Sequence, residues 1–225
     1  MSNEVEITVQ TAETNAYSPE WIRDEVIRII EIFESGQMPP IVQLGHPVLR
    51  AQAADFTDQL NSELLRRLLD TMRAVMLNAP GVGLAAPQLG IPLRIAVLQD
   101  LYETTEEIAA VREREPLEYF EIINPIYSAI GTRTATFYEG CLSFNGYQGV
   151  VERPADIATS YLDADGAAHE KNFSGWQARI FQHETDHLSG TVYIDKAITR
   201  SLCANHEYVR WTNPDIAEAK IGLNF

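Results

Sequence analysis

The sequence predicts an α+β fold, in which antiparallel sheets pack around one central helix and an acidic amino-terminal extension precedes the domain. Three observations support this prediction. Residues 58–77 have a strong helical periodicity of apolar side chains, residues 94–162 contain several short β-like segments, and a helical periodicity returns over residues 174–188. Strands in series, flanked by separate helices, are typical of the α+β class.

The first 40 residues form the acidic extension, with eight acidic and two basic side chains. Residues 20–34 are expected to form one amphipathic helix. Its apolar side chains at helical spacing are Trp21, Val26, Ile29, Ile30 and Phe33. Gly36 and the pair Pro39-Pro40 then interrupt the pattern. The chain is therefore divided into the extension 1–40 and a domain at 41–225.

The domain is expected to begin with a core helix over residues 58–77 that ends before Pro80. Its apolar stripe consists of Leu60, Leu64, Leu65, Leu68, Leu69, Met72, Val75 and Met76. Strands are expected at 94–99, 119–123, 132–138, 149–152 and 157–162, with a turn at 163–166. The acidic insert 101–118 is interpreted as an exposed loop or a short helix. Ser174 is the expected N-cap of the helix at 174–188.

The charge excludes two classes of function. There are 17 basic and 32 acidic side chains, for a formal net charge of −15. Binding to DNA or to an anionic membrane surface requires basic clusters, so neither is expected. The amino terminus lacks the basic and apolar runs of a signal peptide, and two cysteines are too few for a disulfide scaffold. A cytoplasmic protein is the simplest expectation.

The helix at 174–188 contains the run His183-Glu184-Thr185-Asp186-His187. Residues four apart lie on one face of a helix, so both imidazoles can bind one metal ion, with Glu184 beside it. The alternative is a solvated helix face on which two histidines coincide. On the first interpretation, the central helix is a metal-binding helix.

Two histidines need a further protein ligand, and Cys141 is the best candidate. It lies in the run 139–143, just after a predicted strand. A thiolate is a good ligand for a divalent transition metal, and a Cys-His-His set leaves a fourth position for water, as in catalytic sites. Considered alone, Cys141 also fits a small buried apolar residue. The glycines of the run 81–88 predict a tight turn with close backbone approach.

Taken together, these motifs resemble those of the peptide deformylases. That family carries a glycine-rich GxGxAAxQ block, an EGCLS block and a QHExDHLxG block in this order, and here they stand at 81–88, 139–143 and 182–190. The resemblance extends from about residue 41 to the carboxyl end. It implies removal of the N-formyl group from the formylmethionine of newly made polypeptides, with release of formate.

The resemblance also implies a metal site and a general base. Cys141, His183 and His187 would hold the metal, with water as the fourth ligand. The family typically uses ferrous iron, although zinc and nickel can occupy the site. Glu184 would take the proton as water attacks the formyl carbon and then deliver it to the departing amine.

Further roles follow from the same resemblance. The Gln88 side-chain amide and the Leu142 backbone N–H would donate to the developing oxyanion. Gly83, with the backbone around Val82 and Leu142, would pair with the extended main chain of the substrate. Val82 and Ile180 are candidates for lining the methionine pocket, although Ile180 equally fits ordinary packing in the helix core.

Several positions leave alternatives open. Many family members have proline where this chain has Asn145, and arginine where it has Gln148, so an altered acyl-peptide specificity is an alternative. Asp186 and Gln182 could orient the histidines or be solvated. Cys203 and His206, three apart in a predicted helix, lack the further ligands of a second metal site.

Two other classes of function fit parts of the sequence. A zincin-like metallopeptidase fits the HExxH run equally well, but such an enzyme usually recruits His or Glu as its third ligand, whereas Cys141 is available here. The second class is a non-enzymatic module derived from a deformylase. Such a module has no need for Glu184 and Gln88, so the presence of both residues argues against it. The sequence leaves the oligomeric state open.

Overall fold

The fold was determined as a computed structural model that describes residues 17–212 and 214–225. The α-helices are α1 (Pro19–Glu34), α2 (Ser62–Asn78), α3 (Glu106–Arg112), α4 (Gly175–His187), α5 (Asn205–Tyr208) and α6 (Ala217–Leu223). The strands are β1 (Gly83–Ala85), β2 (Ile95–Asp100), β3 (Leu117–Ala129), β4 (Thr134–Cys141), β5 (Phe144–Pro154), β6 (Asp156–Leu162), β7 (Ala168–Ser174) and β8 (Cys203–Ala204).

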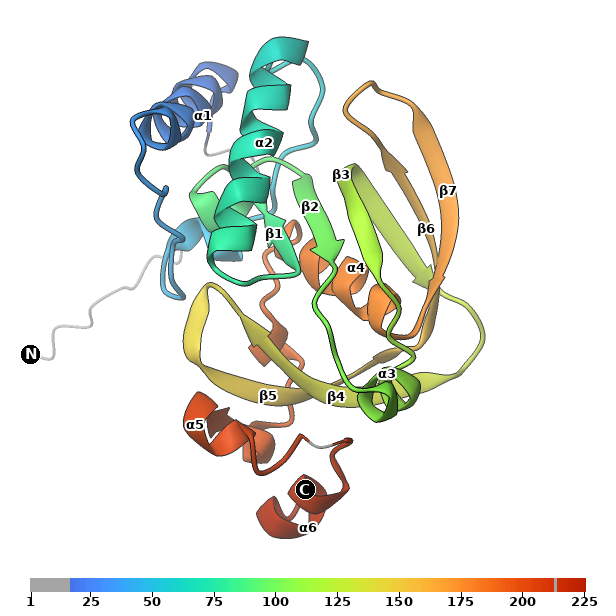
Figure 1. The fold of residues 1–225 in the computed structure, drawn as a ribbon. Coiled ribbons are helices and arrows are strands. Elements are labelled where there is room, and N and C mark those ends of the chain that lie inside the picture. The colour runs from blue at the N-terminus through green and yellow to red at the C-terminus, as the bar shows by residue number, and fades with distance from the viewer. Residues whose placement is uncertain (1–16, 213) are drawn as a thin grey trace, which may run out of the picture.

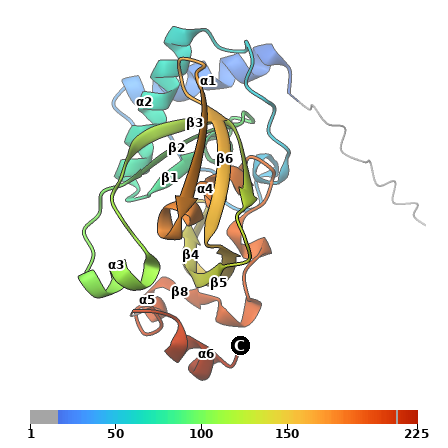
Figure 2. The ribbon, with the colours of Figure 1, turned by 90° about the vertical axis from the view of Figure 1, so that its right-hand side faces the viewer.

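Two antiparallel sheets enclose α4. The larger has the strand order β1-β2-β3-β6-β7, and the smaller has the order β4-β5-β8. Helix α4 packs against strands of both sheets and is central in the molecule (Figure 1). Seen from the side, the larger sheet lies above β4, β5 and β8 (Figure 2). The predicted α+β class, with antiparallel sheets around a central helix, is confirmed.

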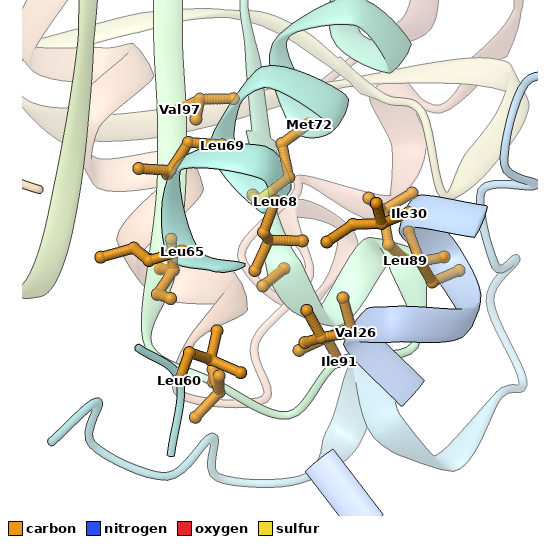
Figure 3. Close-up of a cluster of buried hydrophobic side chains, with 14 of the residues drawn as sticks. Val26, Ile30, Leu60, Leu65, Leu68, Leu69, Met72, Leu89, Ile91 and Val97 are labelled. Atoms are coloured by element: carbon orange, nitrogen blue, oxygen red, sulfur yellow. The ribbon is translucent and has the colours of Figure 1, made fainter. Parts of the chain in front are cut away.

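The helix expected at 20–34 is α1, which begins after Ser18, whose side chain accepts a hydrogen bond from the backbone N–H of Trp21. Its buried face packs on α2, where Val26 and Ile30 join Leu68 in one apolar cluster (Figure 3). Trp21 was expected on that face but is 42% exposed, and Ile22 is buried instead. The division of the chain at residue 40 stays a prediction, and residues 1–16 of the extension lie outside the described part of the chain.

The core helix is confirmed as α2, but it begins at Ser62 and not at residue 58, so Leu60 of the expected stripe lies before it. The order of the five expected strands is confirmed, but three strands were not predicted. Strand β1 lies inside the glycine-rich run, β7 has only Phe173 buried, and β8 is two residues long. The β3 strand continues beyond the expected end at residue 123. Asn124 has a positive φ of 51° and the register shifts between Ile123 and Ile126, so the side-chain alternation that predicts a strand is broken at this point.

Three further predictions concern local structure. Ser174 occupies the N-cap position of α4, but its side chain makes no capping hydrogen bond. Cys203 lies in β8 and His206 in α5, so their predicted common helix is wrong. The insert 101–118 contains α3, which has no buried residue. Within the described residues, no helix is long and apolar enough to cross a membrane.

Candidate active site

Three side chains from two elements converge beside α4. Cys141 ends β4, and His183 and His187 lie one turn apart on α4. One ligand atom from each falls within 4.8 Å of the others, the only such group found in the described part of the chain. The Sγ atom of Cys141 is 3.2 Å from Nε2 of His187. The sequence-predicted ligands are therefore brought together.

This donor set fits a divalent transition metal. A soft thiolate with two imidazoles is one of the combinations that bind zinc and similar ions, and it leaves a coordination position open. Nδ1 of His183 lies 2.9 Å from a carboxylate oxygen of Glu139, which leaves Nε2 as that ring's free donor atom. A carboxylate that orients a ligating imidazole is a common feature of protein metal sites.

Glu184 lies between the two histidines in sequence and is buried, at 4% exposure. Its Oε2 atom has no hydrogen-bond partner among the described residues. Burial raises the pKa of Glu184 to about 7, with smaller opposing effects from His183 and Arg153. A carboxyl group with a pKa near neutrality can both accept and return a proton at physiological pH.

Gly83 allows the Glu184 carboxylate to lie directly against β1. A β-carbon at position 83 would overlap the carboxylate group of Glu184. The close backbone approach predicted from the glycine-rich run is thus observed, and the approaching group is a side chain of α4.

We expect Gly83→Ala to lower kcat/KM for the expected hydrolysis by about a hundredfold, because the added β-carbon would displace the Glu184 carboxylate, and a misplacement of about 1 Å in a candidate active site has effects of that size. The steady-state rate of that hydrolysis measures this loss. The control is Gly131→Ala, whose β-carbon would meet nothing within 4 Å. Its positive φ of 69° predicts lower stability with unchanged kcat/KM. Equal kinetic effects of the two substitutions would contradict the role of the Gly83 contact.

Gln88 is buried in the short 3₁₀ helix that follows β1, and its amide is held at both ends. Its Oε1 atom accepts from the backbone N–H of Ala85 at 2.8 Å. Its Nε2 atom lies 3.3 Å from Oγ of Ser143 and 3.6 Å from Sγ of Cys141. The donor end of the amide therefore lies beside Cys141, one of the three candidate ligands. Leu142 follows Cys141 directly, and its carbonyl accepts from Gln43 at 3.0 Å.

A network of buried ion pairs holds Glu139, the carboxylate that contacts His183. Arg153, 2% exposed, donates from Nε to Glu139 at 2.6 Å and from Nη1 to Asp186 at 2.7 Å. Burial raises the pKa of Glu139, but Arg153, His183 and Arg179 outweigh it and hold the pKa well below its ordinary value. Glu139 therefore stays ionised while it binds His183.

The network was not expected from the sequence, although Glu139 stands in a motif that was recognised. Asp186 and Gln182 are both buried, so the solvated interpretation is wrong for each. Asp186 accepts from Arg153, Tyr127 and Lys196. Gln182 donates to the carbonyls of Pro154 and Ala178. Neither side chain contacts the histidines in these hydrogen bonds, whereas Glu139 does.

A cavity of about 880 Å³ is lined by two of the three candidate ligands, Cys141 and His183, and by Glu184. The sequence-predicted substrate residues Val82, Gly83 and Ile180 line it, as do Asn145 and Gln148. The positions that depart from the common family pattern thus face the same space as the candidate metal site.

Comparison with known families decides among the functions that this geometry allows. The family model described as polypeptide deformylase matches residues 38–202. The chain belongs to this family. It is 47% identical to peptide deformylase 3 of Streptomyces avermitilis over 199 residues, which cover 88% of this chain and 89% of that protein. It is 50% identical to a Bifidobacterium adolescentis peptide deformylase over 181 residues, covering 80% and 83%.

Solved structures agree. The Met-Ala-Ser-bound class I type b peptide deformylase of Acinetobacter baumannii has a TM-score of 0.63 at 32% identity, covering 70% of this chain and 96% of that one. The Thermotoga maritima enzyme has a TM-score of 0.61 at 34% identity, covering 72% and 98%. This deformylase is therefore a metal-dependent hydrolase that removes the N-formyl group from newly made polypeptides and releases formate.

Proposed function

We propose that Cys141, His183 and His187 hold ferrous iron, and that Zn²⁺ or Ni²⁺ can occupy the same site. The convergence of their ligand atoms within 4.8 Å carries this proposal. When bound, the metal would lower the pKa of water and so supply a nucleophile near neutral pH. The remaining chemistry falls to the side chains around it.

Glu184 is the general base and then the general acid. It accepts a proton as water attacks the formyl carbon, and it returns the proton to the nitrogen of the departing amine as the C–N bond breaks. Its burial, its unpartnered Oε2 atom and a pKa of about 7 support this role. The products are formate and a peptide with a free methionine amine.

Gln88 and Leu142 stabilise the negative charge that develops on the formyl oxygen. The Gln88 amide donates from Nε2, which its Oε1 bond to Ala85 keeps directed toward the site. The backbone N–H of Leu142 is the second donor. Donors fixed before the reaction favour the transition state because they need no reorganisation.

The substrate is an N-formylmethionyl nascent chain in extended conformation. Within the described residues, β1 is an edge strand of the larger sheet, so the backbone around Val82 and Gly83 can pair with an added strand. Leu142 also lines the cavity and offers further backbone to the substrate. Val82 and Ile180 form part of the pocket for the methionine side chain.

The surroundings of the enzyme follow from this substrate. Nascent formylated chains place its work in the cytoplasm, beside the ribosome. The excess of acidic over basic side chains, 32 against 17, supports a ribosome contact that is weak or confined to a local patch.

The decisive experiment measures formate released from formyl-Met-Ala-Ser by anaerobically prepared, iron-loaded protein. We expect turnover, and we expect Cys141→Ser to lose both metal and activity because serine is a poorer ligand for a transition metal. The control is Cys203→Ser, since Cys203 lies in β8, outside the ligand group. Formate at the level of the metal-free control would falsify the assigned reaction. A Cys141→Ser enzyme with normal metal content and rate would remove Cys141 from the ligand set.

A further inference from the structure

The acidic insert 101–118 contributes one side chain to the catalytic cavity. Helix α3 in this insert lies beside β4, beyond the end of the larger sheet (Figures 1 and 2). The helix has no buried residue. Arg112, its last residue, nevertheless lines the same cavity as Cys141 and His183. An otherwise exposed helix thus places a cation in the substrate space.

The guanidinium of Arg112 is held by aromatic rings and one polar neighbour. Its central carbon lies 5.1 Å from the ring centroid of Trp176 and 5.8 Å from that of Phe137. Its Nη2 atom donates to Oγ1 of Thr212 at 2.6 Å and to the Thr212 carbonyl at 3.2 Å. These contacts fix the orientation of the guanidinium without neutralising its charge.

The charge of Arg112 has no acidic partner among residues 17–212 and 214–225: no ion pair includes it. Its Nε atom is buried and has no hydrogen-bond partner in the same part of the chain. A ligand in the cavity cannot reach this buried atom, but Nη1 makes no hydrogen bond to the described residues and is not one of their buried unpartnered atoms. Nη1 is therefore the cationic donor left to bind an acceptor.

Arg112 lies at the end of the cavity reached along α4 from the candidate metal site. His183, Ile180 and Trp176 are spaced by three and four residues, so they follow one face of the helix, and all three line the cavity. The seven-residue step from Trp176 to His183 corresponds to about 10 Å of helix. Arg112 stacks beside Trp176, at the far end of this row.

We propose that Arg112 forms the far wall of the side-chain pocket and selects side chains whose end accepts a hydrogen bond. This inference rests on the methionine pocket proposed above. A thioether sulfur is a weak acceptor, a methylene is none, and a sulfoxide oxygen is a strong one. The enzyme should therefore act on formyl-methionine sulfoxide peptides in preference to the nearly isosteric formyl-norleucine peptides.

The test compares kcat/KM for formyl-methionine-sulfoxide-Ala-Ser, formyl-norleucine-Ala-Ser and formyl-Met-Ala-Ser with the iron-loaded full chain. We expect Arg112→Met to lower the sulfoxide-to-norleucine ratio about tenfold, the range for a hydrogen bond to a charged group. Because both substrates are measured on one protein sample, the ratio does not depend on the fraction of active enzyme. Metal content and Tm are recorded for each variant.

Two control variants separate selection from structure. Arg66→Met removes an arginine of an exposed ion pair with Asp165, remote from the cavity, and should leave the ratio unchanged. Thr212→Val loosens the anchoring of Arg112 while keeping its charge and donors. An unchanged ratio in Arg112→Met, or an equal fall in Arg66→Met, would overturn the proposal, whereas Thr212→Val should lower the ratio less than Arg112→Met does. A wild-type enzyme inactive on all three peptides would instead refute the proposed function on which this inference rests.

Discussion

Replacing Glu184 with glutamine is expected to lower kcat by a factor of about 10² to 10⁴, the contribution typical of a positioned general acid–base group. Glutamine has nearly the same shape, so the contact with Gly83 and the packing of α4 are kept. What is lost is the ability to accept a proton from water and return it to the amine. We assign the proton transfer to the buried Oε2 atom of Glu184, which has no partner in the described structure.

The measurement is single-turnover and steady-state formate release, with metal content determined on the same samples. Glu170→Gln serves as the control, because this exposed carboxylate of β7 lies outside the cavity. A Glu184→Gln enzyme with normal metal content and a wild-type rate would remove Glu184 from the proton-transfer role. A variant that lost its metal would require Glu184→Asp, which retains a titratable carboxyl group.

Replacing Arg153 with methionine is expected to destabilise the protein by about 3–5 kcal/mol, the loss observed when one partner of a buried ion pair is removed. Arg153 is 2% exposed and binds two buried carboxylates, Glu139 and Asp186. Without it, Asp186 retains Lys196 and Glu139 retains Arg179, but both carboxylates lose a desolvated cation. Most of this loss should therefore appear as a lower free energy of unfolding.

Urea unfolding of the metal-free protein measures the effect separately from any change in metal affinity. The matched control is Arg133→Met, which removes an exposed arginine that also binds two carboxylates, Glu113 and Asp156. Exposed pairs contribute roughly 0–1 kcal/mol, so the control should lose far less. Similar losses in the two variants would show that burial of the Arg153 network has no special importance for stability.

The parts of the fold that were predictable are those whose sequence pattern is local. The stripe from Leu64 to Met76 specifies α2 because one face of the helix is buried along its length. Strand β7 could not be predicted, since its run Ala168–Ser174 alternates only weakly and its pairing with β6 supplies most of its order. Strand β1 was hidden because a three-residue strand in a glycine-rich run has no periodicity of its own.

The candidate site likewise has residues that a local sequence pattern predicts and residues whose contacts depend on the folded chain. The spacing of His183 and His187 is local, and Cys141 became the third candidate through its motif. The partnership of Glu139 with Arg153 depends on the register of β4 and β5, in which Glu139 lies opposite Gly149. The position of Arg112 depends on how the insert packs against Trp176. No pattern within one segment encodes either contact.

The candidate ligands come from two elements that meet only in the folded chain. Cys141 ends a strand of the smaller sheet, and the histidines lie on the helix between the sheets, so an unfolded chain cannot present the three atoms together. An ion that binds only the folded state stabilises it in proportion to the logarithm of its free concentration. The lifetime of the enzyme in a cell is therefore coupled to metal supply, and metal starvation should deplete the protein as well as its activity.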